Sequence, residues 1–469
     1  MPASAEIDIG IAIRKKTTRM DASGVPFRIA LLGDFGGRSS RGADRWLTNP
    51  LTIDSGNLEE TMELIEVGVR LSLGGTPFEI SFSSPRDFHP DSLQERLPLF
   101  QAVARLRAQL ADPGTFPAAA AFLGSVDRAG TPQAVSPGSL GSAQGGSAAA
   151  QRALDPAAGW DDFLRRSVAA HLTPGTDPSQ AEWIAAVDAA AGTLMRACLA
   201  HPAFQNLEAA WRSVIFLLQR LDTRANLRIE LIDVTKEELV GLEPSGWSAA
   251  ACLHSFAPHP EDCRLLAVLA AIGRRAGGPV LTAIDARLAG CASIAETPDP
   301  ERWHTPLDEA SETAWRWLRA DPDARWLGVT LPRFLLRLPY GPGTGQFACI
   351  PFEEMPSPPV HDAFLWGSGA VACVCLLGHA FLRHGWNMRP GQVRRLEGLP
   401  VHTYFHDGER LMTPPAEVWL SEYRAERIVE YGAMPLASPR ASDSLRMMHF
   451  QSAADPPAPL AGPWEPPMG

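Results

Sequence analysis

Four side chains near residue 380 belong to the types that bind zinc: Cys373, Cys375, His379 and His384. They lie in or next to a mostly apolar stretch, from about Phe364 to Arg383, that predicts an α-helix. Each helical residue advances by about 100° around the axis, so Cys375 and His379 share a face while the other two point the opposite way. A tetrahedral zinc site needs converging ligands. The spacing therefore favours buried thiols and helix-end histidines, and we expect no metal.

An acid and a base also stand close together, at Asp87 and His89 within Asp87-Phe88-His89-Pro90. A carboxylate and an imidazole can share general acid and base work. In a loop before a helix, however, these residue types are typical of turns and caps, and no serine or cysteine nucleophile is singled out nearby. We interpret the pair as structural. An uncharacterised α/β enzyme that uses the pair with the turn at 33–37 stays open as an alternative.

Two glycine-rich segments fail to complete a phosphate-binding pattern. Gly33–Gly37 follows a strand but lacks the third glycine of a dinucleotide fingerprint, and Gly341–Gly345 is not followed by Gly-Lys-Ser/Thr. The adjacent carboxylates Glu353 and Glu354 point apart, which disfavours a shared catalytic proton. The sequence therefore predicts no catalytic, cofactor-binding or metal-binding site.

The composition is that of a globular protein with several domains. The chain has 469 residues, of which 45% are hydrophobic and 20% charged, and a net charge of −11 at pH 7. The sequence has no long lysine- or arginine-rich run of the kind that binds a nucleic-acid phosphate backbone, so nucleic-acid binding is disfavoured. Seven scattered cysteines, no recognisable export signal and no apolar stretch long enough for a membrane span favour a cytoplasmic location.

The strongest local pattern is an alternation of isoleucines near the N-terminus. Ile7, Ile9, Ile11 and Ile13 alternate with small or acidic residues, and this period of two predicts a β-strand with one apolar face. An exposed strand edge of this kind must be covered. We expect either its own domain or a neighbouring subunit to cover it, and take the four isoleucines as candidate subunit-interaction residues.

Composition and periodicity divide the chain into four parts, and the predicted fold class is mixed α/β. Residues 1–112 predict a small α/β domain, and residues 113–157, rich in Pro, Gly, Ala and Ser, predict a flexible linker. Residues 158–452 predict a larger α/β domain, and residues 453–469 a disordered tail. The expected helices lie at 58–69, 91–110, 183–194, 204–221, 262–274 and 364–383, and the expected strands at 27–32, 78–82, 227–231, 280–284 and 326–331.

Several segments resemble the two proteins of the type VI secretion contractile sheath. Pro26–Phe35, Phe78–Phe82 and Asp87–Asp91 are similar, in order and spacing, to the small sheath protein TssB. His201–Arg212 and Leu331–Gly341 resemble the signature helix and the most recognisable motif of the large sheath protein TssC. The family-motif residues are Asp34, Asp87, His89, Pro90, Phe204, Glu208, Trp211, Pro332, Arg333, Arg337, Pro339, Tyr340, Gly385 and Trp386.

The two arginines of the TssC-like motif carry a physical expectation of their own. Arg333 and Arg337 lie among Leu, Phe and Pro, where an unpaired charge is costly. We expect them to reach carboxylates within the subunit or across a contact. Glu353 and Glu354 are the candidates nearest in sequence.

The resemblance implies a structural subunit rather than an enzyme. Family members pair small and large subunits, stack helically around an inner tube on a baseplate, contract to deliver proteins and are recycled by an ATP-driven unfoldase. This chain is then expected to be a TssB-like region fused to a C-terminally truncated TssC-like region, self-assembling or joining other sheath subunits, with no cofactor, nucleic acid or membrane span. A specialised relative at a sheath end or baseplate, or a non-contractile variant, stays open.

Overall fold

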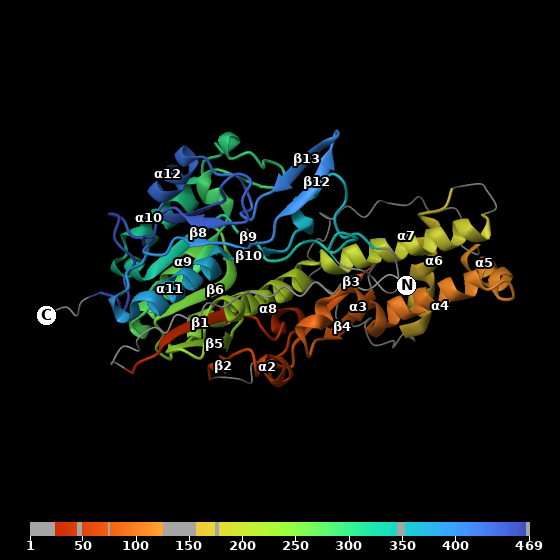
Figure 1. Ribbon diagram of the computed structural model, residues 1–469, viewed down its shortest axis with the longest axis horizontal. Coiled ribbons are helices and arrows are strands. Elements are labelled where there is room, and N and C mark those ends of the chain that lie inside the picture. The colour runs from red at the N-terminus through yellow and green to blue at the C-terminus, as the bar shows by residue number, and fades with distance from the viewer. Residues whose placement is uncertain are drawn as a thin grey trace, which may run out of the picture.

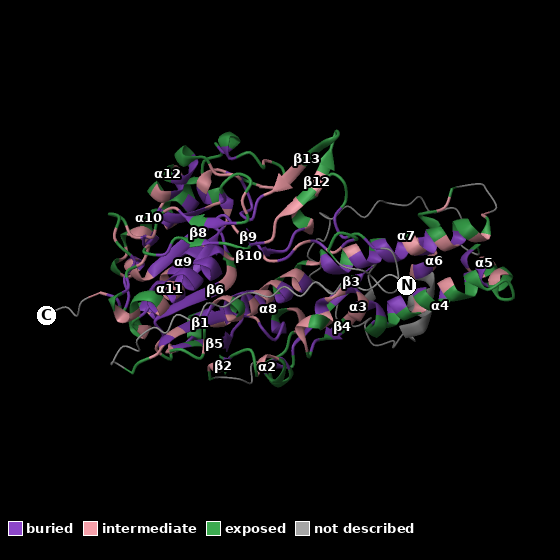
Figure 2. Cartoon of the chain, in the orientation of Figure 1, coloured by how far each residue is buried: buried purple, intermediate pink, exposed green. Residues whose placement is uncertain are grey.

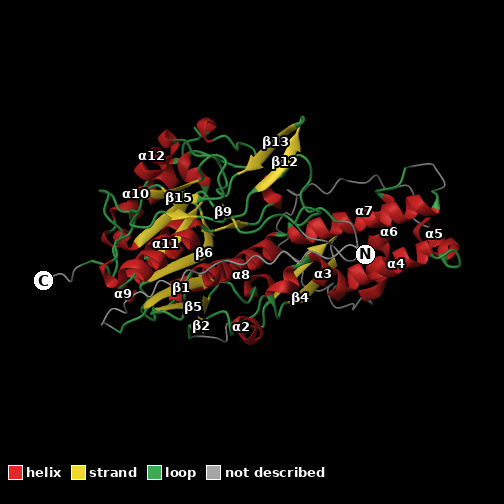
Figure 3. Ribbon diagram, in the orientation of Figure 1, coloured by secondary structure: helices red, strands yellow, loops and turns green. Residues whose placement is uncertain are grey.

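The computed structural model describes residues 24–44, 49–73, 76–124, 156–173, 178–344 and 352–465. The predicted strand at Ile7–Ile13 and most of the predicted linker lie outside these residues. The described chain is elongated, with a large β-sheet and its covering helices at one end and a group of helices at the other (Figure 1 and Figure 3). The predicted mixed α/β class is confirmed.

A nine-stranded sheet runs through the larger end, in the order β11-β15-β14-β8-β7-β6-β1-β5-β2. The inner strands from β14 to β5 are parallel, whereas β2 at one edge and β15 and β11 at the other are antiparallel to their neighbours. The inner strands are nearly continuous apolar runs because both faces of a parallel sheet are covered. The strands are β1 Phe27–Gly33, β2 Leu51–Ile53, β5 Leu227–Asp233, β6 Ala249–Phe256, β7 Val280–Ile284, β8 Leu327–Leu331, β11 Arg395–Leu396, β14 Ala433–Ala437 and β15 Leu445–Met447.

Strand β1 comes from the N-terminal region, but both of its neighbours come from beyond residue 158. Phe27 pairs with Leu227 of β5, and Ile29 pairs with Ile229 of β5 and Ala249 of β6. The N-terminal region therefore contributes a middle strand to a sheet that it shares with the larger region.

Side chains alternate across β1 and enter two separate cores. Ile29 and Leu31 pack in the core with α8 and α11, whereas Ala30 and Leu32 pack in the core with α9, α10 and α12. This alternation is the period-two pattern of a strand whose faces are both buried (Figure 2). The five helices are α8 Pro202–Arg220, α9 Pro260–Ala276, α10 Glu309–Ala320, α11 Gly369–His384 and α12 Glu422–Glu430.

The opposite end of the molecule is a group of helices from both regions. Helix α4 contacts α5 and α7, and α6 contacts both α5 and α7. Arg107 of α4 pairs with Asp188 of α7 at 2.6 Å, which joins the two regions again. The helices are α3 Pro90–Arg96, α4 Pro98–Ala111, α5 Phe116–Gly124, α6 Pro156–Ala169 and α7 Gln180–Leu199.

Short elements complete the described chain. They are the helices α1 Arg38–Arg41 and α2 Leu58–Ile65, and the paired strands β3 Gly68–Leu73 with β4 Thr76–Ser81, β9 Phe334–Leu335 with β10 Trp366–Gly367, and β12 His402–His406 with β13 Glu409–Thr413. In the part of the chain that is described, no single helix has the length and apolar character of a membrane span; α7 and α8, bent by 64°, meet that test only as a pair.

Three expected helices are shorter or more broken than the apolar spacing predicts. The helix expected at 364–383 begins only at Gly369, because Trp366 and Gly367 form strand β10. The helix expected at 58–69 ends at Ile65, because Glu66 takes a left-handed conformation with φ 55° and Val69 then belongs to strand β3. The helix expected at 91–110 is broken between α3 and α4. Leu97 is extended there because Pro98 disfavours a helical conformation in the residue before it.

The predicted linker and tail also need correction. The alanine-rich part of the segment 113–157 forms α5, and Leu123 of this helix is buried. Residues 453–465 are ordered rather than disordered, with Leu460 and Trp464 in the core. The backbone oxygen of Trp464 accepts a hydrogen bond from Arg389 at 2.9 Å. The proline and alanine content of the tail concealed the two large apolar side chains that anchor it.

Candidate functional site

The motif arginine Arg337 lies at the centre of a buried group that we call the arginine cluster: Arg337, Arg212, Glu208, Glu354 and Tyr340. The Arg337 guanidinium contacts Glu208 at 2.7 and 3.0 Å and Glu354 at 2.7 and 2.9 Å, so both carboxylates are held by two hydrogen bonds. Arg212 donates to Glu208 at 2.6 Å and to the Tyr340 hydroxyl at 2.8 Å. Two positive and two negative side chains thus balance within one buried site.

Burial makes these pairs interdependent. The side chains of Arg337, Glu208 and Glu354 are 8%, 0% and 4% exposed. Burial alone would raise the pKa of the Glu208 carboxyl, but the charges of Arg337 and Arg212 outweigh it, and the net shift is downward. Burial, with the Glu208 charge beside it, raises the pKa of Tyr340 to about 12, so its hydroxyl stays protonated. The arginine cluster is therefore a buried network of ion pairs.

Helix α8 supplies Glu208 and Arg212 to the arginine cluster. Its first turn is capped by His201, whose Nδ1 accepts from the Ala203 amide at 3.3 Å, with Pro202 in the first helical position. Phe204, Glu208 and Trp211 follow at helical spacing and are all buried. The Trp211 indole donates to the Phe35 carbonyl at 3.0 Å, just after β1.

The TssB-like motif meets the same site from the other side. The rings of Phe88 and Phe204 are 5.7 Å apart and edge-on, and Phe82 stacks on Phe88 at 4.2 Å. His89 meets the Tyr340 ring edge-on at 5.0 Å. The two motifs singled out in separate parts of the sequence therefore contact each other directly.

The acidic residues of the TssB-like motif act as local caps. Asp34 accepts from the amides of Arg38 and Ser39 at 2.7 and 2.9 Å. Asp87 accepts from the Ser83 and Ser84 amides and pairs with Arg96 at 3.0 Å. His89 caps α3, and Pro90 is the first residue of that helix.

A second charged group surrounds Arg333. Its guanidinium and its amide both donate to Glu417, which is 2% exposed. His361 lies between Glu417 and Asp362, at 2.9 and 2.8 Å, and stacks on Trp366. Burial would raise the pKa of Glu417, but Arg333 and His361 lower it to about 2. Burial opposes protonation of His361, yet its hydrogen bond to Glu417 gives its pKa a net upward shift.

The remaining family-motif residues shape the backbone. Pro332 follows the last residue of β8, and the Pro339 carbonyl accepts from the Thr344 hydroxyl at 2.8 Å. Gly385 ends α11 with φ 56°, a conformation that favours glycine. Trp386 donates to the Val25 carbonyl at 3.2 Å and packs on Phe27, so it holds the start of β1.

Both motif arginines reach carboxylates within the chain, as expected, but only one of the two candidate partners pairs with them. Glu354 pairs with Arg337 as expected. Glu353 pairs with neither arginine; its carbonyl accepts from Arg196 at 3.1 Å. The partner of Arg333 is Glu417, 84 residues away, for which the sequence carries no local signal.

Two further members of these charged groups were missed. Arg212 stands four residues after Glu208, and that helical spacing could have identified it as a partner. His361 lies 56 residues from Glu417 and carries no such signal.

The residues considered for catalysis are dispersed or engaged elsewhere. Two open hollows, of about 370 and 240 Å³, include neither Asp87 nor His89. Burial raises the pKa of Cys252 and Cys375 to about 12, so these thiols are not nucleophiles at neutral pH. Within the described residues, no three His, Cys, Asp or Glu side chains gather as a metal site would require.

Comparisons with known proteins agree with this geometry. Residues 181–242 and 240–454 match the family described as EvpB/VC_A0108, tail sheath N-terminal domain, and residues 11–114 match the family described as Type VI secretion system, VipA, VC_A0107 or Hcp2. Type VI secretion system sheath protein TssC1 of Pseudomonas aeruginosa is 29% identical over 308 residues, which cover 58% of this chain and 61% of that protein. The chain thus spans about three-fifths of the length of this relative.

The two family matches fall on the two regions that share the central sheet and meet at the arginine cluster. A two-part α/β sheath protein is the class that this arrangement defines. The chain belongs to the tail sheath family of the type VI secretion system, with a TssB-like N-terminal region and a TssC-like remainder. Proteins of this family are structural.

Replacing Arg337 tests how strongly the arginine cluster stabilises the fold. Arg337→Ala leaves two buried carboxylates without their main partner, and we expect the free energy of unfolding to fall by roughly 3–5 kcal/mol. Urea denaturation followed by tryptophan fluorescence measures this. Arg224→Ala is the control, because its side chain is 87% exposed, and the loss there should stay below about 1 kcal/mol. A wild-type unfolding curve for Arg337→Ala would contradict a buried pair.

The raised pKa of His361 predicts a pH-dependent contribution to stability. A group whose pKa is higher in the folded state stabilises fully below its ordinary value of 6.5, and loses that contribution as the pH rises through the folded value. The stability difference between wild type and His361→Gln should therefore be largest at about pH 5.5 and shrink towards about pH 8.5. Urea denaturation across this range measures it. The exposed His304→Gln serves as control, and a difference for His361→Gln that grows with pH would refute the assignment.

Proposed function

We propose that this chain is a structural subunit of a type VI secretion contractile sheath in which the small and large sheath regions form one preassembled pair. The observation that carries the proposal is the position of β1. A strand from the TssB-like region lies between two strands of the TssC-like region, with Phe27 paired to Leu227 on one side and Ile29 to Ala249 on the other. Such pairing makes each region part of the core of the other.

The proposed division of the chain keeps two functional regions in one folded unit. Residues 1–112 act as the small-subunit region and residues 158–452 as the large-subunit region. Residues 113–157 join them, and the residues after 452 complete the core of the second region. The contacts between Phe88 and Phe204 and between His89 and Tyr340 support this pairing, because they join family-motif residues of both regions.

The proposed partners follow from the family. The chain self-assembles or joins other sheath subunits in the cytoplasm, surrounds an inner tube, starts from a baseplate and is recycled by an ATP-driven unfoldase. It carries out no reaction of its own and takes no cofactor. Heterologous contacts between copies that do not close on themselves give the helical polymer that this role requires.

The isoleucine strand is the proposed link between subunits. Ile7, Ile9, Ile11 and Ile13 give one apolar face to a strand that can pair with the sheet edge of a neighbouring copy. The outermost strands of the central sheet in the described chain are β2 and β11, and their free sides are where such a strand would add.

Cutting the linker tests the pairing of the two regions. With a protease site introduced between Ser136 and Gly146, the cleaved halves should elute together on gel filtration, because β1 stays hydrogen-bonded to β5 and β6. The uncleaved variant is the control. Two separate peaks that both keep folded circular dichroism spectra would contradict the pairing.

Removing the isoleucine strand tests its role in assembly. Deletion of residues 1–13 should leave a folded protein that forms no sheath-like polymer in electron micrographs, with or without a separate inner-tube protein. Ile9→Asp with Ile11→Asp should act in the same way, because both change the apolar face. Asp8→Asn, on the other face, should assemble as wild type does. If the truncated protein unfolds, the strand belongs to its own core; if it assembles normally, the strand is not the link.

A further inference from the structure

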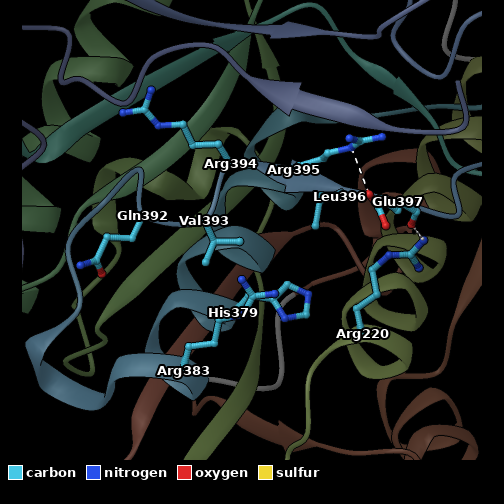
Figure 4. A pocket seen from close by; sticks show the side chains of 9 residues that line it. All are labelled: Arg220, His379, Arg383, Gln392, Val393, Arg394, Arg395, Leu396 and Glu397. Atoms are coloured by element: carbon cyan, nitrogen blue, oxygen red, sulfur yellow. Dashed lines mark hydrogen bonds and ion pairs between the residues drawn. The ribbon is translucent and has the colours of Figure 1, made fainter. Parts of the chain in front are cut away.

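A cationic pocket lies beside the edge strand β11 (Figure 4). It is an open hollow of about 370 Å³ between the end of α8, the last turns of α11 and the segment that contains β11. Arg220, Arg383, Arg394 and Arg395 line it from these different elements, and Glu397 is the one carboxylate among its lining residues. The pocket therefore has a clear excess of positive charge in a protein whose net charge is −11.

The local contacts leave most of this charge uncompensated. Arg395 pairs with Glu397 at 3.1 Å, while Arg220 donates only to the carbonyls of Glu397 and Gly398. Arg394 donates to the Gly391 carbonyl at 2.7 Å, and Arg383 has no hydrogen-bond or ion-pair partner within the described chain. Three guanidinium groups thus lack a carboxylate partner and are available to an anionic group from outside.

The imidazole of His379 in the same pocket also reflects the excess of positive charge. His379 lies on α11 between Arg220 and Arg383 (Figure 4). Burial and the charges of these two arginines lower its pKa, so the ring is neutral near pH 7. The positive field already present resists one more proton, and such a field attracts carboxylates.

An acidic helix face lies at the opposite edge of the same sheet. Helix α2 follows β2, the outermost strand on that side. Glu59, Glu60 and Glu63 are exposed along it at helical spacing, with Leu64 beside them 47% exposed. Glu59 accepts from the Ser84 hydroxyl, while Glu60 and Glu63 have no ion-pair partner in the described residues. This face and the cationic pocket are complementary in charge.

We propose that the acidic face of α2 in one copy of this chain docks into the cationic pocket of the next copy. Within the described chain no ion pair joins the glutamates of α2 to the pocket arginines, so one copy does not neutralise its own two surfaces. A contact between different surfaces of identical chains is heterologous, and it extends from copy to copy. The aliphatic stems of the pocket arginines can cover Leu64 while their charged ends meet Glu60 and Glu63.

This inference deepens the proposed sheath function, on which it rests, by naming a lateral contact separate from the isoleucine strand. Because it joins exposed charges, it should weaken as salt is raised and the screening length falls below about 8 Å. An association held by an apolar strand would respond little to salt.

Neutralising either surface tests the contact. In analytical ultracentrifugation, the wild type should form larger oligomers at low salt than at high salt, where only the isoleucine strand still links the copies. Arg383→Ala with Arg394→Ala should abolish this salt-dependent growth, and so should Glu60→Gln with Glu63→Gln. All four side chains are exposed, so thermal unfolding should stay unchanged. The controls remove exposed charges elsewhere, at Arg224→Ala and Glu309→Gln, and should associate as wild type does.

Mixing the two neutralised variants tests whether the acidic face of α2 is what fills the cationic pocket. Each keeps one intact surface, so in chains that also carry Ile9→Asp and Ile11→Asp an equimolar mixture should stop at a one-to-one dimer instead of growing. A mixture of this kind that stays monomeric would overturn the proposal, as would salt-sensitive association that survives either pair of substitutions or a wild type whose size does not change with salt. Loss of association with the arginine pair alone would assign the pocket to a different acidic segment, which also overturns it.

Electron microscopy separates this inference from the sheath function itself. Sheath-like tubes from the wild type and from both neutralised variants would leave the proposed function standing and overturn the contact. Salt-sensitive oligomers that depend on both surfaces, but never form tubes even with an inner-tube protein, would support the contact and contradict the sheath role.

Discussion

The insertion of β1 between β5 and β6 is the constraint on which the rest of the structure depends. A parallel strand in this position is buried on both faces and hydrogen-bonded along both edges. It divides the apolar interior into a core with α8 and α11 and a core with α9, α10 and α12. Removing β1 would open both cores at once and expose the edges of two inner strands. The two sequence regions are therefore one cooperative unit, although a long segment separates them.

The buried charges give this unit its specificity. An apolar core tolerates small shifts in packing, whereas a buried arginine must find both of its carboxylates. Arg337 joins Glu208 on α8 to Glu354, and Tyr340 extends the same group to His89 of the N-terminal region. An alternative packing of the TssC-like region, from which all four charged members come, would leave charges buried without partners. The arginine cluster thus acts as a check on correct assembly of the core.

The elements built from local patterns could be predicted from the sequence, and the contacts between distant segments could not. Strand β1 and helix α8 follow from periodicity and from the His201-Pro202 start signal. No local pattern shows that β1 would enter the sheet of a region 200 residues later, or that Glu417 would reach Arg333. The composition of the tail predicts disorder, but two buried apolar residues, Leu460 and Trp464, anchor it. The position of Arg337 among apolar residues predicts a buried ion pair, because an unpaired guanidinium there is too costly.

The place of β1 in the sheet also determines how late this strand can pair while the chain is being synthesised. Phe27 leaves the ribosome 200 residues before its partner Leu227, so at roughly 5–20 residues per second the strand waits on the order of 10–40 s for its neighbours. During that interval it is an apolar strand with two unpaired edges. In a two-chain sheath this waiting time would depend on how often the partner is met in the cell. A covalent connection replaces that encounter with a local concentration set by the length of the connection, and guarantees equal amounts of both halves. The waiting time of the unpaired strand therefore no longer depends on how often a separate partner is met.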